Sequence, residues 1–273
     1  MEQKIAVLLP VYKNDLAEWF ESAISSVANQ FGAYILIGVD GPIGGDLSAM
    51  VAKWEDVENV KVYYYAENRG LACVLNDLLD VALDNGFEFI ARMDADDISM
   101  QDRFARQIAF LEQHPDIDVV GGTIEEIDEQ GKNRGKTVSY PETPIECKKF
   151  FAKRNPHAHP AVLFRKSFFN KLDGEKYRPE YRQNQDTMLW FDGMMHGTLH
   201  ANIPDVVLKF RVTDAMFKKR RNGWAFAKKQ FEDRLIINRG LGFGIMADIY
   251  GFAMFCLLIA PVWIKKFAYK MLR

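Results

Sequence analysis

The chain has 273 residues, of which 48% are hydrophobic and 26% are charged, and its formal net charge at pH 7 is −2. This composition is typical of a globular protein with enough apolar residues for a sizeable core, and the small net charge excludes general nucleic-acid binding. The length predicts one large domain, or one domain with an appendage.

The first 120 residues alternate short apolar runs with helical patterns. This spacing predicts strands at Ile5–Leu9, Tyr34–Val39, Val60–Tyr65 and Phe87–Met93, and helices at Leu16–Phe31, Asp46–Trp54, Leu71–Leu83 and Met100–His114. The alternation predicts a mostly parallel sheet that helices cover on both sides. Because right-handed crossovers bring the carboxyl ends of parallel strands to one edge, we expect a ligand site at that edge.

The pattern changes after Val119. A strand pair is predicted over Thr123–Val138, around the turn residues 130–133, and an apolar run follows the segment Asn155–Pro160. Residues 180–197 are first polar and then helical, and Val206–Val212 is a further strand candidate.

The last part of the chain is basic and apolar. Residues 209–273 hold fourteen Lys or Arg and four Asp or Glu, a net charge of +10 that leaves −12 for residues 1–208. Basic clusters at 218–221, 228–229 and 265–266 lie around the uncharged stretch 249–264, which is shorter than the roughly 20 residues that span a bilayer. We therefore predict that residues 213–273 form a basic, apolar helical tail that binds an anionic membrane surface. The alternative is a buried C-terminal helix with a solvated basic face.

The cysteines and the N-terminus indicate the compartment. Cys73, Cys147 and Cys256 are far apart and have no metal-like spacing, which favours a reducing environment. The apolar residues 5–9 are too few for a secretory signal peptide. We expect a cytoplasmic protein, peripheral on the cytoplasmic face of the inner membrane.

Three acids follow a buried strand in the run Ala91–Asp97. Asp94, Asp96 and Asp97 repel one another unless a cation neutralises them, and Mg²⁺ is usually bound by one or two carboxylates together with substrate phosphates. The run therefore predicts a metal–diphosphate site. The alternative is an acidic turn in which Asp97 or Ser99 caps the next helix.

Taken together, these features resemble the family 2 glycosyltransferases, inverting enzymes of the GT-A fold. The matching segments occur in the same order and spacing over about residues 3–212, and are Val7–Asn14, Asp40-Gly41, Glu67–Leu71 with Asn76, Arg92–Asp97, Asn155–Pro160 and Gln185-Asp186. The resemblance is greatest to bacterial enzymes of O-antigen, capsule or exopolysaccharide synthesis. It implies a GT-A catalytic domain at 1–212, with a nucleotide-binding half at 1–120 and an acceptor half at 121–212.

The resemblance also implies a UDP-sugar site with the following roles. Asp40 would accept a hydrogen bond from the uracil N–H, and Pro10 and Tyr12 would line the nucleobase pocket. Arg69 would approach the nucleotide or diphosphate, and Gly70 permits close backbone approach or a sharp helix start. The structural alternatives are a turn-forming Asp40, strand-end packing for Pro10 and Tyr12, and a solvated cation for Arg69.

The catalytic roles implied by the resemblance fall on acidic residues. Asp94 would face the ribose and the metal, Asp96 would ligate Mg²⁺ or Mn²⁺, and Asp97 assists or caps. Asp186 is the candidate general base, which takes a proton from the attacking acceptor hydroxyl. Its structural alternative is an N-cap of the helix over 187–195.

Two positions need separate comment. The family usually shows Glu-Asp where this chain has Gln185-Asp186, so the base is kept but any acceptor contact of the preceding Glu is in doubt. His159 is a candidate contact to the acceptor or the metal, with a purely structural role as the alternative. Asn76 lies in the middle of a predicted helix, where it is a site candidate or a polar-face residue.

The expected reaction is transfer of a hexosyl group, of glucose or galactose type, from a UDP-sugar to an undecaprenyl-diphosphate-linked saccharide. A sugar-1-phosphate nucleotidyltransferase is one alternative, although the segment Pro10–Asn14 lacks the glycines that such enzymes carry after the first strand. A non-catalytic membrane-assembly subunit is another, and retention of Asp40, Asp94, Asp96 and Asp186 together speaks against it.

Overall fold

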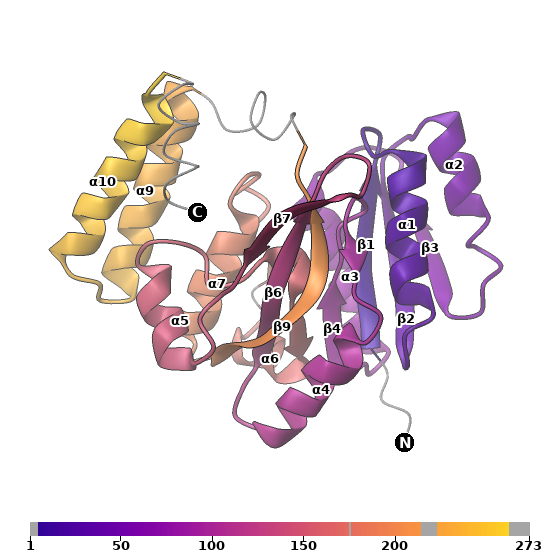
Figure 1. Ribbon diagram of the computed structural model, residues 1–273, viewed down its shortest axis with the longest axis horizontal. Helices are drawn as coiled ribbons and strands as arrows, with labels where there is room; N and C mark the ends of the chain where they lie inside the picture. Colours follow the sequence, from indigo (N-terminus) through magenta and orange to yellow (C-terminus); the bar gives the residue numbers. More distant parts are fainter. Residues whose placement is uncertain (1–4, 175, 214–222, 262–273) are drawn as a thin grey trace.

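The structure is a computed structural model that describes residues 5–174, 176–213 and 223–261. Its centre is a nine-stranded sheet with the strand order β3-β2-β1-β4-β8-β6-β9-β5, and β7 pairs with β6. Figure 1 shows this sheet with helices around it and a pair of C-terminal helices at one side. The strands are β1 Ile5–Tyr12, β2 Ala33–Asp40, β3 Val60–Tyr64, β4 Phe89–Arg92, β5 Ile98–Ser99, β6 Val119–Ile127, β7 Asn133–Val138, β8 Leu163–Arg165 and β9 His200–Arg211.

The first half of the sheet is parallel, as predicted: β3, β2, β1 and β4 pair in parallel. The helices of this half are α1 Ala17–Ala28, α2 Gly45–Ala52, α3 Leu71–Asp84 and α4 Arg103–Gln113. Alternate residues of β1 enter different cores: Val7 and Leu9 pack with α1, α2 and α4, whereas Ala6 and Leu8 pack with α3. A strand that is buried on both faces reads as a continuous apolar run, which is why this half was predictable.

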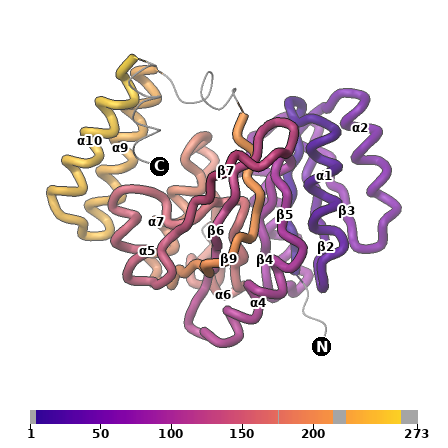
Figure 2. The backbone as a smooth tube through the Cα atoms, viewed as in Figure 1, coloured from indigo at the N-terminus to yellow at the C-terminus, as the bar shows by residue number. Residues whose placement is uncertain are grey.

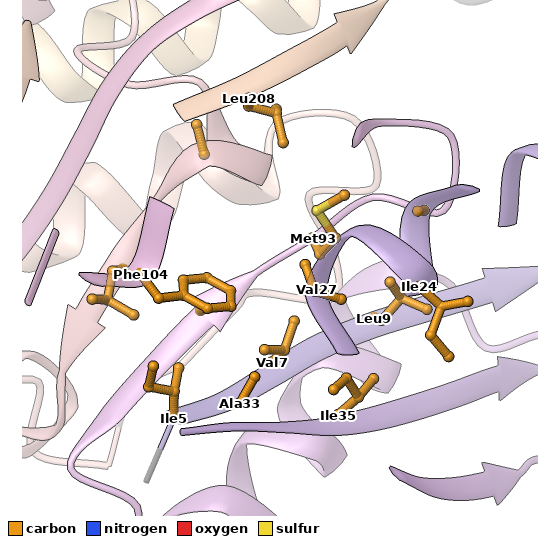
Figure 3. Packing of buried hydrophobic residues seen from close by; sticks show 14 of the residues in the cluster. Ile5, Val7, Leu9, Ile24, Val27, Ala33, Ile35, Met93, Phe104 and Leu208 are labelled. Atoms are coloured by element: carbon orange, nitrogen blue, oxygen red, sulfur yellow. The ribbon is translucent and has the colours of Figure 1, made fainter. Parts of the chain in front are cut away.

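Figure 3 shows the first of these cores, in which Ile5, Val7 and Leu9 of β1 lie beside Ile24 and Val27 of α1. All five side chains are fully buried. Burial of an aliphatic side chain of this size contributes about 1.5–3 kcal/mol, so this layer holds the β1–β2–β4 edge in a fixed position beneath the predicted site.

The second half of the sheet is mixed. β8 is antiparallel to β4 and β6, β9 is parallel to β6, and β5 is antiparallel to β9. The predicted pair over Thr123–Val138 is confirmed as β6 and β7. The strand predicted at Val206–Val212 is longer in the structure and begins at His200. Its first part was not predicted because the polar residues His200 and Asn202, which are buried, interrupt the apolar pattern.

The remaining helices cover the second half. They are α5 Pro144–Phe151, the short 3₁₀ turn η1 His159–Ala161, α6 Lys166–Lys171 and α7 Gln185–Met195. The helical prediction for 180–197 is confirmed as α7, whose buried Leu189 and Trp190 join the core that α3 shares with α6.

The C-terminal part is a helical hairpin of α9 Trp224–Gly240 and α10 Ile245–Ile259. The tube in Figure 2 follows α9 and α10 as two adjacent antiparallel helices. Among the described residues no helix combines the length and apolarity needed to cross a bilayer. The buried-helix alternative is wrong for α10, because Ile245 is 74% exposed. The basic clusters at 218–221 and 265–266 lie outside the described residues.

Candidate active site

The residues predicted for the nucleotide and the metal lie at the carboxyl ends of the parallel strands. Tyr12 and Asp40 are register partners at the ends of β1 and β2, and Pro10 pairs with Gly38. β4 runs beside β1 and ends at Arg92, which is the partner of Leu8. The acids that follow β4 therefore emerge beside the Pro10–Tyr12 segment, as the strand pattern predicted.

Asp40 fastens the loop that precedes α3. Its carboxylate accepts hydrogen bonds from the backbone N–H groups of Arg69 (2.7 Å) and Gly70 (3.0 Å), and its own carbonyl accepts from Asn68 Nδ2 (3.1 Å). Gly70 is the N-cap of α3 with φ +92°, a left-handed conformation that allows the sharp helix start. Asp40 thus holds Arg69 and Gly70 at the strand edge.

Arg69 makes two side-chain contacts and remains partly exposed to solvent. Its guanidinium forms an ion pair with Asp77 of α3 and lies 4.3 Å from the centre of the Tyr65 ring. Both ion-pair partners remain more than one-third exposed, so the pair contributes little to stability, and the nucleotide role of Arg69 stays a prediction.

The three acids after β4 form a compact cluster. Asp94, Asp96 and Asp97 each offer a carboxylate oxygen within 4.8 Å of the others. Burial, followed by the charge of Asp94, raises the pKa of Asp96 to about 6, although Arg211 and Arg92 oppose the shift. Burial also raises the pKa of Asp97 well above its ordinary value. The cluster is therefore short of positive charge.

Asp97 is buried and does not cap a helix. One carboxylate oxygen accepts from the backbone N–H of Arg211 (2.8 Å), and Oδ2 is buried without a hydrogen-bond partner. Ser99 belongs to β5 and also caps no helix, because α4 has Asp102 at its N-cap. The cap alternative for this acidic run is therefore wrong.

Three arginines that the sequence did not single out support the acidic loop. Arg92 is buried and pairs with Asp94. Arg103 of α4 is fully buried and donates to the carbonyls of Arg92 (3.1 Å) and Val162 (3.0 Å). Arg211, at the end of β9, donates through Nε to the Asp96 carbonyl (2.7 Å). The sequence offered one indication that Arg211 belongs to the site, which is its position as a charged residue at the end of an apolar strand.

The donor set fits a divalent metal. Hard cations take oxygen ligands, and here three carboxylates converge, one of them with a buried and unpartnered oxygen. Burial, and after it the charge of Asp94, raises the pKa of Asp96, and a bound cation would favour its charged form. Asp94 and Asp96, with Asp97 behind them, are the residues that would hold Mg²⁺ or Mn²⁺.

Asp186 lies in the first turn of α7. Its Oδ2 accepts from Asn155 Nδ2 (3.1 Å), and Thr187 Oγ1 donates to Asn155 Oδ1 (3.1 Å). The N-cap of α7 is Asn184, so the cap alternative for Asp186 is wrong. Asn155 fixes the direction of the Asp186 carboxylate, a role that was not predicted because the two residues come from distant segments.

A buried tyrosine that the sequence pattern did not identify contacts His159. Tyr177 is buried, and its hydroxyl is 2.9 Å from His159 Nε2. Burial is the main cause that raises the pKa of Tyr177, and the charges of Asp186 and Asp94 add to it. His159 therefore has the buried Tyr177 hydroxyl as its partner, and among the described residues it is not part of the acidic cluster.

Asn76 explains how Tyr177 is held. The Asn76 side chain donates to the Tyr177 carbonyl (2.8 Å) and accepts from the Tyr177 N–H (3.0 Å), so α3 is tied to the segment that leads into α7. The alternative of a simple polar-face residue is wrong.

Asn76→Ala should destabilise the protein by about 2 kcal/mol, because two half-buried backbone groups of Tyr177 lose their partners. Urea unfolding measures the difference. Asn85→Ala is the matched control, since Asn85 at the end of α3 is exposed and bonds only within its own helix. An equal loss of unfolding free energy in both variants would show that the hydrogen bonds between Asn76 and Tyr177 add no stability beyond that of a local helix contact.

Comparison with known proteins decides the family. The model of the protein family "Glycosyl transferase family 2" matches residues 6–172 of this chain. The chain belongs to glycosyltransferase family 2. It is a glycosyltransferase, and the acidic cluster Asp94, Asp96 and Asp97 is the DxD-like feature of the enzyme. The family assignment favours glycosyl transfer over the nucleotidyltransferase alternative.

Similar proteins agree with this assignment. The glycosyltransferase is 31% identical over 229 residues to the amylovoran biosynthesis glycosyltransferase AmsE of Erwinia amylovora, with 83% of each chain covered. It is 26% identical over 226 residues to the Escherichia coli UDP-Gal:alpha-D-GlcNAc-diphosphoundecaprenol beta-1,3-galactosyltransferase, covering 82% of this chain and 79% of that one.

A solved structure confirms the fold. The crystal structure of S. aureus TarS 1–349 in complex with UDP-GlcNAc superposes with a TM-score of 0.66 at 16% identity, covering 92% of this chain and 70% of that chain. The α/β architecture with a mostly parallel sheet and C-terminal helices is therefore the GT-A fold that the sequence predicted.

Proposed function

We propose that this glycosyltransferase moves a hexosyl group, of glucose or galactose type, from a UDP-sugar to a lipid-linked saccharide in surface polysaccharide biosynthesis, with inversion at the anomeric carbon. The observation that carries the proposal is the cluster of Asp94, Asp96 and Asp97 after β4, beside the Pro10–Tyr12 edge of β1. We assign diphosphate binding to this cluster and the base to Asp186, which Asn155 orients.

The donor half of the site is assigned to the β1–β2 edge. Tyr12 and Pro10 line the nucleobase pocket, and Asp40 accepts from the uracil N–H. Both Asp40 oxygens already accept one backbone N–H, and each keeps a second lone pair for the base. Arg69, whose backbone N–H donates to Asp40, is the cation that we assign to the nucleotide or the diphosphate.

The metal half is assigned to the acidic loop. Mg²⁺ or Mn²⁺, when bound by Asp96 and Asp94, offsets the negative charge that develops on the departing diphosphate. Arg92 orients Asp94 through their ion pair, and Arg211 fixes the Asp96 backbone. These buried arginines keep the acidic loop in place before substrate arrives.

The acceptor chemistry is assigned to Asp186. The acceptor hydroxyl oxygen attacks the anomeric carbon, the bond from that carbon to the diphosphate oxygen breaks, and UDP leaves with the electron pair. Asp186 takes the hydroxyl proton, and Asn155 holds its carboxylate in position for the transfer. A single displacement of this kind inverts the configuration.

The acceptor class is inferred from the relatives. The name of the E. coli relative specifies galactosyl transfer to GlcNAc on diphosphoundecaprenol, and that of the Erwinia relative specifies amylovoran biosynthesis. For this chain we propose an undecaprenyl-diphosphate-linked saccharide as acceptor, residues 121–212 as the acceptor half, and residues 213–273 as the segment that binds the anionic cytoplasmic face of the inner membrane.

The test is release of UDP by the purified full chain with Mn²⁺, a synthetic GlcNAc-diphospholipid, and UDP-glucose, UDP-galactose or their N-acetyl forms in turn. We expect acceptor-dependent release with one glucose- or galactose-type donor, and a β-linked product by NMR from an α-linked donor. UDP binding without turnover on any donor would contradict the proposed acceptor, and absence of UDP binding would contradict the donor site.

A further inference from the structure

The outer face of α10 is apolar and exposed. Seven of the twelve large exposed apolar side chains among the described residues belong to the hairpin, including Ile245, Met246, Ile249 and Phe252, which are 54–74% exposed. The exposed positions 245, 249, 252, 256 and 259 recur at intervals of four and three, and so form one stripe along the helix. Soluble chains rarely leave so continuous an apolar surface without a partner.

The opposite face of α10 is used for packing on α9. Ala247 and Gly251 are buried, and a Cβ on Gly251 would lie 3.0 Å from Arg234, so these small residues let the two helices approach. Phe231 of α9 contacts the ring of Phe255 (centroid distance 5.8 Å) and, at the border between the packed and the exposed face, the ring of Phe252 (6.0 Å). The exposed stripe is therefore the side of α10 that points away from the molecule, as the outermost helix in Figure 1.

Helix α9 connects the hairpin to the rest of the molecule next to α7, the helix that carries Asp186. Asn184, the N-cap of α7, donates to Asp233 (2.8 Å) and accepts from Gln230 (2.7 Å), both on α9. Arg234 donates to the carbonyl of Phe151 in α5 (2.5 Å). The hairpin is thus tied to the chain two residues before Asp186.

The chemistry of the stripe indicates lipid rather than a second copy of the chain. Soluble helix pairs flank their apolar seam with charged residues, whereas the single charge of α10, Asp248, accepts from Asn238 of α9 (2.8 Å). At the positions beside the stripe, where such pairs carry charges, α10 has the apolar residues Met246 and Ala253. The net charge of +10 on residues 209–273 complements anionic headgroups, whereas the −12 of the remaining chain is repelled by them.

The length of α10 sets its orientation. Its 15 residues extend about 22 Å, which is less than the roughly 30 Å hydrocarbon core of a bilayer. A helix that is too short to cross this core, with one side packed on α9 and an uncharged exposed side, lies in the plane of the interface rather than across it.

We propose that α10 lies in the plane of an anionic phospholipid bilayer with the stripe 245–259 among the lipids, while α9 connects it to the start of α7. This inference rests on the proposed function in one respect: it places Asp186 on the membrane side, where a lipid-linked acceptor is held. The contact with lipid itself requires neither donor nor acceptor.

The test is flotation of the purified full chain with vesicles of phosphatidylglycerol and phosphatidylethanolamine, in the absence of nucleotide and acceptor. The double variant Ile245→Glu/Ile249→Glu places two charges on the stripe at residues that are 74% and 54% exposed. We expect its vesicle partition coefficient to fall by about tenfold or more. The matched control, Phe31→Glu/Ile145→Glu, adds the same charge at two apolar residues that are each 69% exposed elsewhere, and should bind as the unaltered chain does.

Three results would overturn the proposal. The first is failure of the unaltered chain to float, and the second is an equal loss of binding in both double variants. The third is a solution dimer that only Ile245→Glu/Ile249→Glu dissociates, which would assign the stripe to a second copy. UDP release from a detergent-dispersed acceptor reports on the enzyme separately, so a membrane defect and a catalytic defect are distinguishable.

Discussion

Asp186→Asn should lower kcat by about 10²–10⁴-fold while leaving UDP affinity nearly unchanged. The substitution keeps the size of the side chain and its contact with Asn155 but removes the group that accepts the proton. Because Asp186 lies on α7 and the proposed nucleotide contacts lie on the β1–β2 edge, donor binding is independent of this change. Steady-state UDP release and a UDP titration measure the two effects separately.

The matched control is Asp46→Asn. Asp46 is the second residue of α2, as Asp186 is the second residue of α7, so both variants lose the same helix-dipole interaction of about 0.3–1 kcal/mol. Asp46→Asn should retain full activity. Retention of a large part of kcat in Asp186→Asn would assign the base to another residue.

Asp96→Asn should abolish metal-dependent turnover and yet make the metal-free protein more stable. The folded-state pKa of Asp96 is about 6, above the unfolded value of about 3.9, because burial and Asp94 disfavour its charge. The folded state therefore binds more protons between these pH values, so its stability falls as the pH rises through about 6. At pH 7.5 removal of the charge should stabilise the metal-free protein by roughly 1–3 kcal/mol.

Thermal unfolding in EDTA measures this gain, and it should vanish below about pH 3, where Asp96 is protonated in both the folded and the unfolded state. Mn²⁺ should raise the melting temperature of the unaltered chain but not of Asp96→Asn. The exposed Asp56→Asn serves as a control that changes neither quantity. A destabilised Asp96→Asn protein at pH 7.5 would show that the carboxylate is structurally satisfied and would argue against the metal site.

The parallel half of the fold was readable from the sequence because its strands are buried on both faces and appear as continuous apolar runs. Val7, Leu9 and Ile35 are fully buried, as their pattern implies. The mixed half was less readable. The first residues of β9 are polar, and their burial depends on His157, which is 2.9 Å from Asn202 and 3.1 Å from His200. No local sequence pattern predicts such pairs, because the partners are more than 40 residues apart.

The same distinction applies to the site. The sequence by itself determined the acids Asp94, Asp96 and Asp97 and the strand-end Asp40, since strand alternation alone brings these residues to one edge. Only the tertiary structure decided which groups orient them: Arg211 on the Asp96 backbone, Asn155 on Asp186, and Asn76 on Tyr177. The physical reason is that local periodicity encodes which face of an element is buried, whereas hydrogen bonds between distant segments depend on how the elements pack.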